Sequence, residues 1–75
     1  MRVLENGCKV RHFKGKEYIF LGKAIHTETN EIMAVYQEIY GDKVIFVRPY
    51  EMFISEVNKE KYPNINQKYR FEIID

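Results

Sequence analysis

The sequence has no tryptophan, one cysteine, two prolines and four glycines among its 75 residues. A single cysteine, Cys8, cannot form an internal disulfide, which favours a reducing compartment, and we expect the cytoplasm. So few glycines and prolines argue against a disordered chain. No uncharged run approaches the roughly 20 residues of a membrane span, and residues 1–6 are too short and too polar for a signal peptide. We therefore expect a small folded protein without a membrane segment.

The length predicts a single domain over residues 1–75. A chain of this size buries only about 60% of the surface that it exposes when unfolded, so its stability is marginal. A catalytic cleft beside a separate core does not fit easily into that volume. The size therefore favours a binding protein over an enzyme.

Charge is unevenly distributed although the formal net charge is only +1. Residues 1–26 carry six basic and two acidic side chains, and residues 27–56 carry six acidic and two basic side chains. One interpretation is that basic and acidic strands pair and their charges compensate, since opposite charges facing each other across strands are mildly favourable. The net charge gives little support to a general nucleic-acid-binding protein.

Short runs rich in β-branched and aromatic residues, separated by turn residues, predict an all-β fold. The expected strands cover residues 8–13, 18–26, 31–40, 43–48, 54–57 and 68–74. For residues 31–38 a helix is the competing prediction, but two hairpin signals flank that segment. Asn30 suits a left-handed turn conformation, and Gly41-Asp42 predicts a tight hairpin turn. Pro49 ends the fourth strand, and residues 50–53 then predict one short 3₁₀-like turn.

The sequence offers no catalytic or metal-binding constellation. Cys8 and His12 share a strand face but lie about 13 Å apart at roughly 3.3 Å per residue, too far for a nucleophile and its base. His12, His26 and Cys8 lack the paired spacing of a zinc site, which needs about four converging ligands. We therefore predict no catalytic residue, no metal and no cofactor, and interpret Cys8 as a small apolar filler.

Two polar segments are candidate binding positions. His26 and Glu28 share a strand face, so they form either a polar contact point or a hydrogen bond that fixes the turn. Arg48 precedes Pro49 and presents a planar fork of donors on an extended backbone. It would hold either a carboxylate within the fold, with Glu28 or Glu51 nearest in sequence, or an anionic group of a ligand.

Two further segments combine aromatic rings with other chemistry. Residues 11–16 place the bases Arg11, His12, Lys14 and Lys16 around Phe13. This pattern suits phosphate contact and base stacking, or else a core phenylalanine flanked by solvated bases. Tyr36 and Tyr40 lie four apart on one predicted strand, either as an exposed platform for a proline-rich peptide or as one core residue and one half-buried plug.

Four blocks in a fixed order carry a family resemblance: R-H-F-K-G-K-E-Y, L-G-K-A-I-H-T-E-T, V-Y-Q-E-I-Y-G and V-R-P-Y-E-M-F. Over residues 8–57 the chain resembles an uncharacterised bacterial domain of unknown function, family 1653, whose fold is an SH3-like barrel. The chain departs from the family pattern at Phe46, where tryptophan is frequent, and at Tyr50, where leucine is frequent. Polar family positions are matched by a set of six residues: His12, Lys14, His26, Glu28, Arg48 and Glu51.

The resemblance implies a small SH3-like barrel of five to six strands with one short 3₁₀ turn, and it implies no activity. By the family pattern Tyr18, Phe20, Gly22 and Ala24 face the barrel core, and Gly22 then marks a bulge or bend.

We predict a small binding module for a protein or peptide. The candidate binding residues are His12, Lys14, His26, Glu28, Tyr36, Tyr40, Arg48 and Glu51. The alternative is a nucleic-acid-associated module that uses the basic residues 11–16. A third option is a small-molecule site around His26, Glu28 and Arg48. The sequence predicts no membrane contact and leaves the oligomeric state open.

Overall fold

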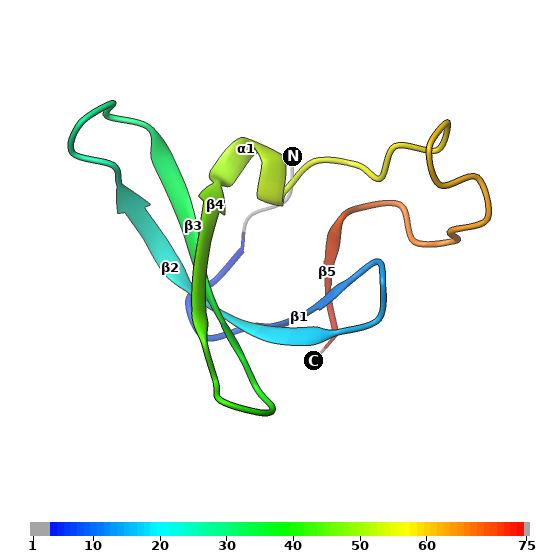
Figure 1. The fold of residues 1–75 in the computed structure, drawn as a ribbon, viewed down its shortest axis with the longest axis horizontal. Helices are drawn as coiled ribbons and strands as arrows, with labels where there is room; N and C mark the ends of the chain where they lie inside the picture. The colour runs from blue at the N-terminus through cyan, green and yellow to red at the C-terminus, as the bar shows by residue number, and fades with distance from the viewer. Residues whose placement is uncertain (1–3, 75) are drawn as a thin grey trace.

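The computed structural model of the chain describes residues 4–74, so the first residues of the stretch assessed for a signal peptide lie outside it. Its elements are β1 (Lys9–His12), β2 (Glu17–Ile25), β3 (Ile32–Glu38), β4 (Ile45–Pro49), α1 (Tyr50–Phe53) and β5 (Phe71–Ile73). The strands form one antiparallel sheet in the order β4-β3-β2-β1-β5 (Figure 1). The all-β prediction is confirmed. Among the described residues no helix is long and apolar enough to cross a membrane.

The strand predictions hold for five of the six expected segments, including β3, where a helix was the alternative. The exception is residues 54–57, for which the strand prediction is wrong: this segment forms one isolated bridge, between Glu56 and Tyr69. The expected 3₁₀ turn is instead one turn of α-helix, since the Ile54 N–H donates to the Tyr50 carbonyl, four residues back, at 3.0 Å. This turn brings Phe53 into the core.

Both predicted turns form. Asn30 adopts a left-handed conformation with φ of 60°, and the Lys43 N–H donates to the Tyr40 carbonyl across Gly41-Asp42 at 3.1 Å. The hairpin loop is longer than a two-residue turn, because β3 ends at Glu38 and β4 begins at Ile45. Turn chemistry thus located the reversals and left the strand ends uncertain.

A bulge in β2 changes which side chains face the core. The pairing with β3 runs from Phe20↔Tyr36 to Gly22↔Val35, so β2 has one extra residue there, as the glycine predicted. Gly22 has φ of 154°, and a Cβ on it would lie 3.3 Å from the Asn6 side chain, so this position favours glycine.

The predicted core face of β2 is therefore correct before the bulge and wrong after it. Phe20 is fully buried, but Ala24 is exposed. Past the bulge Lys23 pairs with the buried Ala34, and its Nζ lies 4.5 Å from the centre of the Tyr50 ring. A one-residue shift exchanges the two faces of a strand, because side chains alternate with period two.

The core lies between the concave face of the sheet and α1. Its buried residues are Leu4, Val10, Phe20, Ala34, Tyr36, Phe53, Val57 and Phe71. The rings of Phe53 and Phe71 stack with centroids 4.0 Å apart, and each fully buried phenylalanine contributes roughly 1.5–3 kcal/mol by leaving water. The half-buried Cys8 packs against this cluster, as expected of an apolar filler.

The sheet is open between its two edges. Strand β4 pairs only with β3, and β5 only with β1, within residues 4–74. Figure 1 shows the sheet curling so that β4 and β5 flank the middle of the molecule. The SH3-like barrel remains an expectation from the resemblance. Four of the candidate residues line the opening between the edges: His12, Lys14, Tyr36 and Arg48.

Candidate functional site: a cationic pocket

A hollow of about 240 Å³ opens between the two sheet edges. It is lined by His12, Lys14, Lys16, Tyr18, Tyr36, Arg48 and Phe71. All five strands contribute one of these residues, and the β1–β2 turn contributes the two lysines. We call this hollow the cationic pocket.

The β1–β2 turn sets the position of the basic side chains at its rim. The His12 N–H donates to the Lys16 carbonyl, and the Gly15 N–H donates to the His12 carbonyl, both at 2.8 Å. The Lys14 N–H donates to Nδ1 of the His12 ring at 3.1 Å. These bonds close the turn, and the last of them makes Nδ1 the ring nitrogen of His12 that accepts a hydrogen bond.

Arg48 enters the pocket from β4. It pairs with the buried Ala34 across the strands, so its side chain lies on the core face of the sheet. Its guanidinium carbon lies 5.4 Å from the centre of the Phe71 ring and 5.9 Å from that of Tyr36. Such cation–π contacts contribute about 0.5–2 kcal/mol each, depending on solvent exposure.

The carboxylate partners expected for Arg48 do not contact it. Within residues 4–74 neither Glu28 nor Glu51 forms an ion pair with its guanidinium. An arginine carries five N–H donors and cannot be deprotonated in a protein. Its packing on two rings positions those donors without neutralising the charge.

His12 reports the electrostatic character of the pocket. Burial, followed by the nearby charges of Arg48, Lys14 and Arg70, lowers the pKa of His12 to about 4. Each of these charges disfavours a further proton, so the imidazole is neutral at pH 7. Burial likewise raises the pKa of Tyr18 to about 12, which keeps its phenol protonated.

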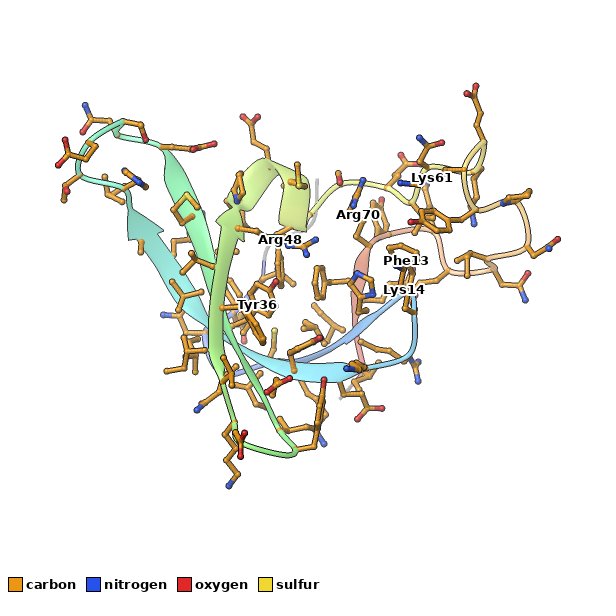
Figure 2. The ribbon with its side chains drawn as sticks, in the orientation of Figure 1. Phe13, Lys14, Tyr36, Arg48, Lys61 and Arg70 are labelled. Carbon is orange, nitrogen blue, oxygen red and sulfur yellow. The ribbon has the colours of Figure 1, made fainter. Side chains whose placement is uncertain are left out.

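Aromatic rings surround the pocket, but other groups cover them. His12 stacks on Phe13 at 4.3 Å, and Phe13 contacts Tyr62 at 4.9 Å. The Nζ of Lys14 lies 5.9 Å and 5.6 Å from the centres of these two rings. Figure 2 shows Phe13 and Lys14 facing Tyr36 and Arg48 across the middle of the molecule.

The two tyrosines proposed as a platform have different places. Tyr36 is only 5% exposed and belongs to the core. Tyr40 is half-buried in the β3–β4 hairpin, with Lys16 Nζ 5.7 Å from its ring centre. The pair therefore forms no exposed aromatic platform, which agrees with the interpretation of one core residue and one plug.

The remaining candidates lie elsewhere. His26 and Glu28 are exposed in the β2–β3 loop, where the Glu28 N–H donates to His26 Nδ1 at 3.2 Å. Glu51 is exposed and lines a different hollow, together with Lys23 and Glu31. The structure thus brings together His12, Lys14, Tyr36 and Arg48, places Tyr40 nearby and separates the other three.

Sequence reasoning missed Tyr18, Phe71 and Arg70 as components of this site. Tyr18 was assigned only to the core. Phe71 and Arg70 come beside His12 through the pairing of β1 with β5, which are distant in the sequence. No group of three histidine, cysteine or acidic side chains suited to a metal ion occurs in the described part of the chain. The donors present suit an anionic ligand.

One comparison with known proteins gives a match. The model of a protein family described as protein of unknown function (DUF1653) matches residues 8–73, nearly the whole chain. No curated protein and no solved structure matches the chain significantly.

Proposed function

Because the chain belongs to the family described as protein of unknown function (DUF1653), we propose a function from its own geometry: it binds an extended acidic peptide segment of a partner protein. The peptide lies along β4 and places one anionic side chain in the cationic pocket. The observation that carries this proposal is that Arg48 belongs both to the pocket and to an edge strand.

The free edge of β4 supplies backbone partners. Glu38 N–H donates to the Val44 carbonyl at 3.1 Å, and alternate residues of an antiparallel pair bond to the same neighbour. Ile45 and Val47 therefore direct their backbone groups away from β3, to the side where no strand pairs in residues 4–74. Unpaired groups of this kind accept an added strand.

The side chains of β4 supply apolar contact. Ile45 is 57% and Val47 59% exposed, on the outer face of the sheet, and Phe46 on the opposite face is 38% exposed. Exposed apolar residues that are contiguous along one strand are typical of protein interaction surfaces. A peptide strand beside β4 would cover both faces with alternate side chains.

A single-stranded nucleic acid is the second candidate, favoured by the cluster of Lys14, Phe13 and Tyr62. Base stacking needs an accessible ring face. Phe13 is instead covered by His12, Tyr62 and Lys14. Arg11, the remaining base of this segment, lies opposite Glu17 and Glu72 on the neighbouring strands, so it adds little net positive charge.

We also propose a cytoplasmic location, for which the support is that the sequence contains one cysteine, Cys8, and so cannot form an internal disulfide.

The test is an amide NMR titration with a short capped peptide of alternating threonine and valine that carries one central glutamate. We expect shifts at residues 12–16 and 45–48. Arg48→Gln should weaken binding roughly tenfold or more, because hydrogen bonds to charged groups contribute about 1.5–3 kcal/mol. Val47→Pro should weaken it too, since proline removes an edge donor without breaking the β3 ladder.

Arg11→Gln is the matched control, since it removes the same charge outside the pocket and should leave the affinity unchanged. The proposal fails if the peptide shifts neither segment. It also fails if a single-stranded oligonucleotide of the same length binds more tightly at both low and high salt.

A further inference from the structure

The wall of the cationic pocket carries three permanent positive charges. Lys14, Lys16 and Arg48 line it, and none of its lining residues is acidic. Glu38 acts on Tyr18 from beside the wall, without lining it. A single carboxylate would neutralise one of the three cations and leave two without a counter-charge among the residues that line the pocket.

Arg70 adds a fourth cation near the same space. It is one of the charges that lower the pKa of His12, so its field reaches the pocket. Its Nε is buried and has no hydrogen-bond partner among the described residues. Arg70 does not line the hollow, so it would act on a bound anion through its charge.

The dimensions of the pocket restrict the ligand group. A hollow of about 240 Å³ is smaller than the roughly 300–1,000 Å³ of sites that enclose a whole drug-sized ligand. It suits one compact terminal group with several acceptor oxygens. A phosphate monoester carries about −1.5 to −2 charges at pH 7 and three such oxygens.

We infer that the anionic group taken by the pocket is a phosphate monoester on a side chain of the bound peptide. This inference rests on the proposed function, from which it takes the peptide strand along β4. The planar fork of Arg48 binds two phosphate oxygens, and the lysines at the β1–β2 turn neutralise the second charge.

A peptide phosphate is favoured over the terminal phosphate of a nucleic acid for two reasons. Tyr36 is 5% and Phe71 1% exposed, so the rings at the base of the pocket offer no face for a nucleobase. The residues of β4 before Arg48 are apolar, and the outer edge of β4 has no paired strand within residues 4–74, which suits an extended peptide.

The experiment compares three capped peptides of alternating threonine and valine that differ only at the centre: phosphoserine, glutamate or alanine. Binding is measured by isothermal titration calorimetry at low salt. We expect the phosphoserine peptide to bind at least about tenfold more tightly than the glutamate peptide, through the extra charge-assisted hydrogen bonds. The alanine peptide should bind most weakly.

Arg48→Lys keeps the positive charge but loses the planar guanidinium fork. It should therefore reduce the ratio of the affinities for the phosphoserine and glutamate peptides. Arg11→Gln should leave the preference intact. Folding of each variant is checked by its amide NMR spectrum before titration.

The outcomes separate the two proposals. Equal binding of the phosphoserine and glutamate peptides, with both tighter than alanine, overturns the phosphate inference and leaves the proposed function standing. Equal binding of all three overturns both. A further titration tests the assignment to peptides. If a 5′-phosphorylated oligonucleotide binds more tightly than the phosphoserine peptide, that assignment is overturned.

Discussion

The protein contains the same local hydrogen bond twice, in two very different regions. In the β1–β2 turn the Lys14 N–H donates to Nδ1 of His12, and in the β2–β3 loop the Glu28 N–H donates to Nδ1 of His26. His26 is exposed, whereas His12 is half-buried.

The surroundings of the two imidazoles account for their different exposure to solvent. His12 stacks on Phe13 and meets the edge of Phe71 at 4.9 Å. Three cations, contributed by β4, by the β1–β2 turn and by the residue before β5, also act on it. The hydrogen bond from a turn N–H to a histidine two residues earlier is therefore a local motif. Only His12 becomes part of a pocket, because strands distant in the sequence pack around it.

The largest effect should come from removing the ring that supports the pocket. Phe71→Ala should lower the free energy of unfolding by about 3–5 kcal/mol, because Phe71 stacks on Phe53 and contacts His12 and Arg48. Urea denaturation followed by circular dichroism measures the loss.

Ile73→Ala on the same strand is the matched control, since Ile73 is 44% exposed. Its loss should be well below that of Phe71→Ala. Equal losses would mean that the pocket floor is no more important to the fold than an exposed position of β5.

The two histidine regions also show how much of the fold follows from the sequence alone. Alternating apolar residues and turn signals located the strands, because both depend on neighbours along the chain. The consequence of the Gly22 bulge was not predictable: the extra residue is defined only by pairing with β3, and it decides whether Lys23 or Ala24 faces the core.

The site shows the same division. Residue chemistry nominated His12, Lys14 and Arg48, but it nominated His26 and Glu28 on equal grounds. What distinguishes the two sets is the register that brings β1 beside β5 and aligns His12 with Phe71. That register depends on contacts between residues about sixty positions apart, which no local pattern encodes.

A smaller effect, confined to one pH range, should come from His12 itself. Its folded pKa of about 4 lies below the ordinary value of 6.5, so between these values the unfolded chain takes up a proton that the folded protein does not. The contribution of His12 to the free energy of unfolding should therefore be complete above pH 6.5. It should be lost as the pH is lowered toward about 4.

The groups that face His12 all oppose its protonation: Arg48, Lys14 and Arg70 by charge, and the rings of Phe13 and Phe71 by excluding water. His12→Gln should flatten the pH dependence of the urea midpoint in this range, while His26→Gln should retain the part that arises from His12. A His12 ring resonance that titrates at pH 6.5 in the folded protein would contradict the prediction.

The smallest effect should come from Glu28→Gln, at the other copy of the motif. Its contact with His26 uses the backbone N–H, which the substitution keeps, so the turn should persist. A surface change of this kind alters stability by no more than about 0.5 kcal/mol, and peptide affinity should be unchanged. If Glu28→Gln weakened peptide binding as strongly as Arg48→Gln, the β2–β3 loop would belong to the site. The distinction between the two histidine regions would then be wrong, because an exposed loop would be acting without the packed rings and cations that surround His12.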